Sequence, residues 1–454
     1  MAQGGEVLRF ELPLTAEATD LSSSTTGIHR LVGRPPVTST ATVIDTDDQR
    51  LLDWGLELSR VAQTGRWVLR APGWEPVLPA EWVSPQAEDE IPSEVAGRLL
   101  PFRRGGILGP KLEVGTVRRR FSLADAAGRA IGEIVDERVR VSRPAGQLAA
   151  FRTVTLTTAA ALAPSARQAV VAAFVAVGGI PVDDAPGLAA RLGLAHRGQY
   201  RDRPSARSVI EEFVGARLES HWRRLLLADL AARVADGGDA ELRAGVRLLR
   251  DELAGLAPLL DAAWVQPGRR LLDAALADTA RPLQRTERWL RILDLLARGS
   301  TEPPLPLVAG RITGPVLAQE LEAVVHLLHD RCRTLDEFAT DERWAQAYQV
   351  AVRARALSRL SRGVFGKPAK RLCRQLEAIA GQLVATVRPD AARLARDLHG
   401  LTAAEIFEAG RIYERTMLSV DYARDRFLRD WPVLWDRLRR RVIRPRVPHQ
   451  AVPS

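Results

Sequence analysis

The chain has 454 residues, 46% of them hydrophobic, so it is long enough for two or three packed domains and its composition excludes a wholly disordered protein. The formal net charge is +10, and arginine carries almost all of the positive charge because lysine occurs only at Lys111, Lys367 and Lys370. A guanidinium stays charged at every working pH and donates paired N–H groups to phosphate. The charge balance therefore favours a polyanionic partner.

Short segments of strand character, separated by Gly and Pro turns, fill the chain from Glu6 to about Thr158. The predicted strands span residues 7–13, 40–46, 56–61, 66–72, 113–123, 130–142 and 149–158. The predicted helices of this half span residues 92–100, 165–177 and 186–192. Many antiparallel strands with few helices predict an α+β domain over residues 1–196, built on a sheet that closes on itself.

A polar, arginine-rich stretch at residues 197–207 predicts a linker. Strand patterns end there, and apolar residues recur at three- and four-residue spacing over residues 208–440. Helical segments joined by short Gly and Pro breaks predict an all-α domain of two helical bundles. The remaining residues, 441–454, predict a flexible basic tail.

The cysteines and the apolar runs indicate the cellular compartment. Cys332 and Cys373 have no metal-ligand neighbours at zinc spacing, which predicts buried, reduced thiols. The first residues lack the pattern of a signal peptide, and the longest apolar run, Ala169–Ile180, is too short to span a bilayer. We therefore expect a cytoplasmic protein without a membrane partner.

Seven sequence motifs follow one another along the chain. The first half contains VIDTDDQRLLDWGLELSRV (43–61), RWVLRAPG (66–73), TVRRRFSL (116–123) and GRAIGEIVDERVRV (128–141). The second half contains ELRAGVRLLRDELAGLAPLLD (241–261), VRARALSRL (352–360) and FGKPAKRLCRQLEAI (365–379). The ordered set resembles a CYTH domain followed by a CHAD domain.

This resemblance implies a function in the handling of phosphate chains. CYTH domains belong to the triphosphate tunnel metalloenzymes, which close their strands into a tunnel where acidic pairs hold Mg²⁺ or Mn²⁺ and basic side chains hold a triphosphate. CHAD domains are paired helical bundles that bind polyphosphate on a basic surface. Several charge neutralisers in a line suit a phosphate chain, and carboxylates around an open cation site suit metal activation of water.

The first half departs from the CYTH pattern at its acidic positions. Threonines occupy the alternating face of the segment 149–158, where the family has glutamates, and threonine is a poor ligand for a hard divalent ion. The family's first acidic signature keeps Glu6 but has Leu8 and Phe10 at its later positions. The threonines are Thr153, Thr155 and Thr157.

One acidic strand remains, because Glu133 and Glu137 lie four residues apart and so share a face, while Asp136 points the other way. If catalysis survives, Glu133 and Glu137 are the candidate catalytic residues, and with Glu6 they are the candidate ligands of Mg²⁺ or Mn²⁺. Alternatively, the two glutamates neutralise arginines of the tunnel. These arginines, the candidate anion-binding residues of the tunnel, are Arg60, Arg70, Arg118 and Arg120.

The helical half carries basic stripes at helical spacing. One is Arg243, Arg247 and Arg250. The segment from Arg353 to Arg374 contains no acidic residue and carries Arg353, Arg355, Arg359, Arg362, Lys367, Lys370, Arg371 and Arg374. Gly363 and Gly366 break the helix within this segment, so Lys367 is expected near the N-terminus of a new helix, where free N–H groups also favour anions. These side chains are the predicted anion-binding residues, and a solvated arginine face is the alternative.

The end of the chain adds further arginines, which we interpret as a nonspecific polyanion-binding tail: Arg437, Arg439, Arg440, Arg441, Arg444 and Arg446. The CHAD histidines have Ala240 and Ala345 at their positions, which weakens a histidine-dependent role but not an electrostatic one.

These features favour a protein that binds inorganic polyphosphate or another polyanion and whose CYTH-like domain is inactive. A Mg²⁺- or Mn²⁺-dependent triphosphatase is one alternative. A nonspecific nucleic-acid-binding protein is another, although no helix–turn–helix or RNP-like pattern is present in the sequence.

Overall fold

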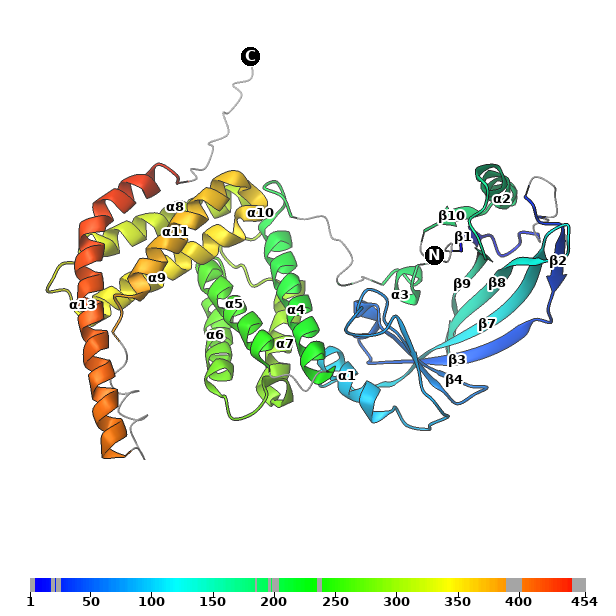
Figure 1. The fold of residues 1–454 in the computed structure, drawn as a ribbon, viewed down its shortest axis with the longest axis horizontal. Coiled ribbons are helices and arrows are strands. Elements are labelled where there is room, and N and C mark those ends of the chain that lie inside the picture. Colours follow the sequence, from blue (N-terminus) through cyan, green and yellow to red (C-terminus); the bar gives the residue numbers. More distant parts are fainter. Residues whose placement is uncertain are drawn as a thin grey trace, which may run out of the picture. The chain divides into compact units, whose positions relative to one another are not determined.

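The computed structural model describes residues 5–17, 21, 26–183, 186–194, 197, 204–234, 239–388 and 402–442. The chain divides close to residue 200 into two compact units. The first unit is built on a sheet and the second is helical (Figure 1). Among the described helices, none combines the length and the apolar character needed to cross a membrane.

One antiparallel sheet forms the first unit, with the strand order β10-β1-β9-β8-β7-β3-β4-β5-β6 and with β2 paired to β7. The strands are β1 Val7–Leu12, β2 Arg30–Gly33, β3 Val37–Asp45, β4 Glu57–Val61, β5 Trp67–Arg70, β6 Glu81–Val83, β7 Gly109–Ala124, β8 Ala130–Arg143, β9 Gly146–Thr158 and β10 Ile180–Val182. Every strand predicted from the sequence is present. The short strands β2, β6 and β10 were not predicted.

The expected closed barrel is wrong for the described strands, because the sheet is open and ends at β10 and β6. Each of these edge strands is three residues long. Pro181 of β10 has no N–H group to donate to a further ladder, which confines proline to sheet edges. Short edge strands of this kind end a sheet instead of extending it.

The two faces of the sheet are covered by different helices, because successive side chains of a strand point to opposite sides. Helix α2 (Pro164–Ala176) packs on the face that carries Phe10 and Val154, which we call the α2 face. The rings of Phe10 and Phe174 stack there with centroids 4.3 Å apart. The short helix α3 (Leu188–Arg191) packs on Val141 at one end of the opposite face, the α3 face.

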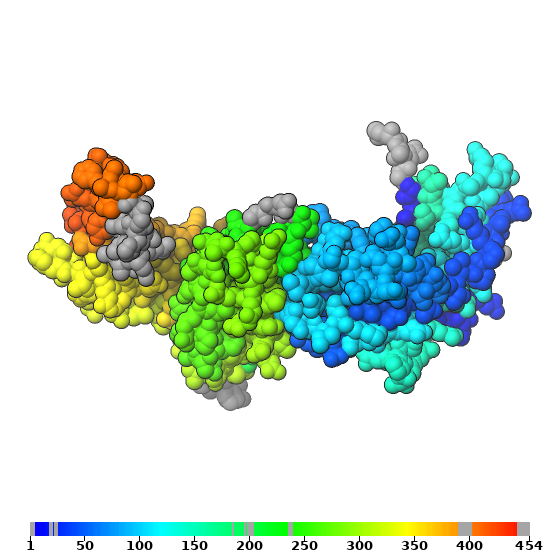
Figure 2. Space-filling model, turned by 90° about the horizontal axis from the view of Figure 1, so that it is seen from below, coloured from blue at the N-terminus to red at the C-terminus, as the bar shows by residue number. Residues whose placement is uncertain are grey.

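Helices make up the second unit, apart from short 3-10 turns and loops. They are α4 Ile210–Val234, α5 Ala240–Leu256, α6 Ala262–Ala277, α7 Glu287–Thr301, α8 Thr313–Cys332, α9 Asp341–Leu360, α10 Arg362–Phe365, α11 Lys367–Val384 and α13 Ala403–Arg439. Helix α9 lies against α5, α8 and α11. Figure 2 shows the N-terminal part of α13 (orange) standing out from the yellow helices of the same unit.

A buried charge cluster joins α4 to α5. Glu252 is 4% exposed, and its carboxylate accepts hydrogen bonds from Arg217 at 2.9 Å and from His221 Nε2 at 2.7 Å. Burial by itself raises the pKa of the Glu252 carboxyl, but the hydrogen bonds and charges of His221 and Arg217 outweigh it and lower the pKa to about 2. The ionised form of Glu252 therefore stabilises the folded state.

Replacing this carboxylate should destabilise the second unit in a pH-dependent way. The pKa of Glu252 is lowered from 4.5 to about 2, so the stabilisation is complete above pH 4.5 and disappears as the pH falls toward 2. We expect Glu252→Gln to reduce the free energy of unfolding by about 3 kcal/mol at pH 7 and by much less near pH 2. Urea unfolding of both chains across this pH range measures the effect.

The exposed Glu414 of α13 provides a matched control. Glu414→Gln should change the free energy of unfolding by less than about 0.5 kcal/mol, because surface substitutions away from specific contacts have small effects. A pH-independent loss in Glu252→Gln would contradict the assignment of the stabilisation to the ionised carboxylate.

Candidate functional site

Arginine–glutamate pairs cross the α3 face between β7 and β8. Arg118 stands opposite Glu137 in the strand register, and its Nε donates to the Glu137 carboxylate at 2.5 Å. Arg120 pairs with Glu133 at 3.4 Å. These side chains are between one third and one half exposed, so each pair contributes at most about 1 kcal/mol. Their main effect is to cancel charge on this face.

Two further groups of charges on the first unit are neutralised in the same way. Arg70 pairs with Glu57 at 3.1 Å and with Glu81 at 2.9 Å on β4, β5 and β6. Arg191 of α3 reaches Glu11 of β1 at 3.0 Å. Three of the four predicted tunnel arginines, Arg70, Arg118 and Arg120, are thus paired with carboxylates of neighbouring strands.

Arg60, the fourth predicted tunnel arginine, does not join this set. It stands opposite Thr42 of β3, which places it on the α2 face. Its Nε donates to the Glu88 carbonyl at 3.1 Å and its guanidinium pairs with Asp89 at 2.7 Å. The structure therefore does not bring the four predicted arginines together.

The predicted metal ligands are also separated. Glu6 precedes Leu8 on the side of β1 that enters the core under α2, and it accepts hydrogen bonds from the Leu162 N–H at 2.9 Å and from Arg167 at 2.7 Å. Glu133 and Glu137 lie on the opposite face, across from Thr157 and Thr153. Within the described ranges, no group of three His, Cys, Asp or Glu side chains could hold a metal ion.

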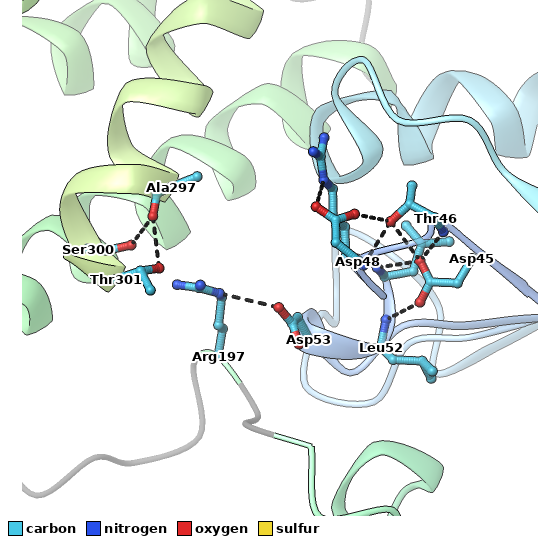
Figure 3. A network of polar contacts seen from close by, with 11 residues as sticks. Asp45, Thr46, Asp48, Leu52, Asp53, Arg197, Ala297, Ser300 and Thr301 are labelled. Atoms are coloured by element: carbon cyan, nitrogen blue, oxygen red, sulfur yellow. Dashed lines mark hydrogen bonds and ion pairs between the residues drawn. The ribbon is translucent and has the colours of Figure 1, made fainter. Parts of the chain in front are cut away.

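Another acidic segment of the first unit, residues 45–53, forms a tight turn that its own carboxylates stabilise (Figure 3). The carboxylate of Asp45 is fully buried and accepts backbone N–H groups of Thr46, Leu51 and Leu52 at 2.6–3.0 Å. Burial raises the pKa of Asp45, although these hydrogen bonds partly oppose the shift. Asp53 forms an ion pair with Arg197 at 3.6 Å. These carboxylates are engaged by the protein itself.

The first predicted stripe of the helical unit is mostly structural. Arg243 is buried, pairs with Asp239 at 2.8 Å, and donates to the carbonyls of Ala275 at 3.0 Å and Arg281 at 3.1 Å. It thereby ties the start of α5 to the end of α6 and the loop that follows. Arg247, one turn later, is exposed and makes no ion pair with the described residues.

Arginines of α5 and α9 share carboxylates from neighbouring helices. Asp251 lies between Arg250, at 3.2 Å, and Arg355, at 3.6 Å, and so links α5 to α9. Arg353 faces Glu320 of α8 at 3.8 Å. The segment that contains no acidic residue in the sequence is therefore partly neutralised by acids that are distant in the sequence.

Glu377 of α11 neutralises the end of α9 and the beginning of α10. It pairs with Arg359 at 3.0 Å and with Arg362 at 3.5 Å, and Arg362 also donates to Cys373 Sγ at 2.9 Å. Burial alone would lower the pKa of Arg359, but the hydrogen bond and charge of Glu377 raise it. The arginines of the predicted stripe from Arg355 to Arg362 are thus all paired with carboxylates of the protein itself.

The basic stripe on α11 differs, because its side chains have no ion-pair partners among the described residues. Gly366, with φ of 59°, allows the chain to turn and start a new helix at Lys367, as the sequence predicted. Leu372 and Leu376 are buried on one side of α11, and the basic side chains are exposed on the other. For this stripe, the described part of the chain provides no ion-pair partner. It consists of Lys367, Lys370, Arg371 and Arg374.

Helix α13 brings the C-terminal arginines to this stripe. The His329 ring of α8 stacks on Trp435 of α13 with centroids 3.9 Å apart, and Trp431 stacks on Phe427 at 5.5 Å. This aromatic row anchors the end of α13 against the body of the unit. Arg437 and Arg439 are helical, so the arginine-rich run interpreted as a nonspecific tail begins within the predicted helical range 208–440. The remaining arginines of that prediction, Arg444 and Arg446, lie outside the described residues.

A groove runs between α11 and the end of α13, and we call it the α11/α13 groove. Its two adjoining hollows have volumes of about 360 and 670 Å³. The residues that line them include no acidic side chain and include Arg371, Arg374, Arg437, Arg440 and Arg441. In the amide orientation that satisfies both of its groups, Gln375 donates to the Arg437 carbonyl at 3.3 Å and accepts from Arg441 Nε at 3.1 Å.

Asp436 is the carboxylate closest along α13 to the groove arginines. It pairs with Arg439 at 2.5 Å and also with Arg440. Arg371, Arg374 and Arg437 have no ion-pair partner among the residues that the structure describes. This groove is the candidate functional site, since it concentrates uncompensated guanidinium groups around a space that an anion can enter.

Glu133 and Glu137 are paired with arginines, and a catalytic assay can test whether they are still able to support hydrolysis. With inorganic triphosphate and Mg²⁺ or Mn²⁺, we expect no phosphate release above the uncatalysed background, because these carboxylates already bind arginines and Glu6 lies on the other face. A colorimetric phosphate assay measures this. Metal-dependent turnover that disappears in Glu137→Ala would contradict the expectation.

No protein-family model matches this sequence, and no curated protein matches it at a significant level.

Proposed function

We propose that this protein binds inorganic polyphosphate in the α11/α13 groove and does not hydrolyse it. The supporting observation is the contrast between the groove and the arginines that are paired elsewhere on the sheet and on helices α5 and α9. Arg118, Arg250 and Arg359 each have a carboxylate partner, whereas Arg371 and Arg437 face an open hollow without one. Uncompensated guanidinium groups in a line attract a chain of phosphates, each of which accepts paired N–H donors.

The residues around the groove favour a phosphate chain over a nucleic acid. Ala378, Ile379 and Leu434 are the apolar residues that line the first hollow, and no aromatic side chain is among the lining residues of either hollow. Single-stranded nucleic acids gain much of their binding energy by stacking bases on aromatic rings. A phosphate chain has no bases and needs only the guanidinium groups.

The resemblance to CYTH and CHAD domains agrees with this function, and the finer architecture that it implies is part of the proposal. Helices α4–α7 would form one bundle, and α8, α9, α11 and α13 would belong to the second. The first unit would be a degenerate relative of the tunnel domains, with an open sheet whose charged face is balanced by its own ion pairs. The proposed setting is the cytoplasm, without a membrane partner and without a required metal.

Removing two groove arginines should weaken polyphosphate binding. We expect Arg371→Ala combined with Arg437→Ala to raise the dissociation constant at least tenfold, which corresponds to about 1.4 kcal/mol. The affinity of the unmodified chain should fall steeply with salt concentration, and this dependence should be shallower in the variant. Titration calorimetry at several salt concentrations measures both effects.

Arg355 provides the matched control, because it is an arginine of the same unit that already faces Asp251. Arg355→Ala alone should change polyphosphate affinity by less than twofold, and so should Arg415→Ala on the exposed surface of α13. Equal losses in the groove and control variants would show that net charge alone accounts for binding.

A second experiment compares polyphosphate with duplex DNA at equal phosphate concentration. We expect the protein to retain polyphosphate more strongly at moderate salt, because a flexible phosphate chain can enter a groove between two helices and a rigid duplex cannot. A pull-down with immobilised ligands and a fluorescence competition assay measure the preference. A preference for DNA would support the nucleic-acid-binding alternative instead.

A further inference from the structure

A second basic region lies on the α2 face of the sheet, opposite the face that carries Arg118 and Arg120. The apolar core under α2 ends at Asp136 of β8 and Arg152 of β9, which form a buried, doubly hydrogen-bonded pair at 2.8 and 2.9 Å. Strand β8 continues past this pair with Arg138 and Arg140 on the same face. Arg138 is partly exposed and Arg140 is exposed.

Positive charge is uncompensated at this place. Arg119 of β7 stands opposite Asp136, and Arg138 stands directly opposite Arg152. Like charges in such positions destabilise a sheet. Asp136 is already engaged by Arg152, which also donates to the Ala16 carbonyl at 2.6 Å.

The arginines beside that pair lack partners. Within the described residues, Arg119, Arg138 and Arg140 make no ion pair, and Arg138 Nε is buried without a hydrogen-bond partner. An orphaned buried donor of this kind costs about 1–3 kcal/mol unless an acceptor from outside the chain satisfies it. The group missing from this site is therefore a hydrogen-bond acceptor that carries negative charge.

A glycine creates space beside these arginines. Gly115 of β7 stands opposite Arg140 of β8 on one side and Thr40 of β3 on the other. A Cβ atom at position 115 would meet no other atom within 4 Å, so the space above the strand is open. Thr38, two residues earlier than Thr40 on the same face, is exposed and adds a second hydroxyl donor.

We propose that this notch, formed by Arg138, Arg140, Gly115 and Thr40, is a binding site for a small free oxyanion of the phosphate class. Residues two apart on a strand are separated by about 7 Å, a distance that two arginine side chains can close around one phosphate group. Guanidinium forks suit its oxygens geometrically, and the absent Cβ lets the anion approach the backbone. Glu113, exposed at the far end of the notch, limits the site to a compact ligand.

The test uses the full chain carrying Arg371→Ala and Arg437→Ala, so that the α11/α13 groove does not contribute. Titration calorimetry with pyrophosphate should then show one binding site in this background. Adding Arg138→Ala and Arg140→Ala should weaken it at least tenfold. Gly115→Val changes no charge and suits a strand, yet it should weaken binding by a similar factor because its side chain fills the notch.

Arg143→Ala is the control, since this exposed arginine lies at the end of β8, beyond the notch. It should change the affinity by less than twofold, and circular dichroism melting should verify that every variant is folded. The proposal is overturned if the background chain does not bind pyrophosphate, or if the Arg138/Arg140 and Gly115 variants bind it unchanged. Failure of polyphosphate binding at the α11/α13 groove would leave this result unaffected.

Discussion

A guanidinium cannot give up its charge at any physiological pH, so each arginine of this chain must find a carboxylate, a carbonyl, solvent or a ligand. Most of the structure can be understood from how this requirement is met. On the sheet, Arg118 and Arg120 bind glutamates of the adjacent strand. Among the helices, Asp251 and Glu377 each serve two arginines. Asp251 thereby connects α5 to α9, which are far apart in the sequence, and Glu377 connects α11 to α9 and α10.

The places where the requirement is not met internally are the ones that bear on function. In the α11/α13 groove, two helices present arginines toward a common hollow, and the nearby Asp436 is engaged by Arg439 and Arg440. In the glycine notch of the sheet, Asp136 is engaged by Arg152 and leaves Arg138 without a partner. In both places the carboxylate nearest to the unpaired arginine already binds another arginine.

Rigid packing keeps these arginines in position. The stack of His329 on Trp435 anchors the end of α13, so that Arg437 faces α11. The buried ionic cluster around Glu252 fixes α4 against α5 in the same unit. Side chains held on packed helices lose less conformational entropy when they bind a ligand than side chains on a free tail would lose.

The sequence by itself determined the strands of the first half and the amphipathic helix that starts at Lys367, because side-chain alternation and helical spacing are local properties. It also offered the pairing of Glu133 and Glu137 with tunnel arginines as one of two alternatives, and the structure shows this pairing for Arg118 and Arg120. Only the tertiary structure decided which arginines remain without a carboxylate partner. The stretch from Arg353 to Arg374 contains no acid, yet Asp251 and Glu320 reach it from other helices. Ion pairing depends on distances of a few ångströms across the fold, which spacing along one segment does not reveal.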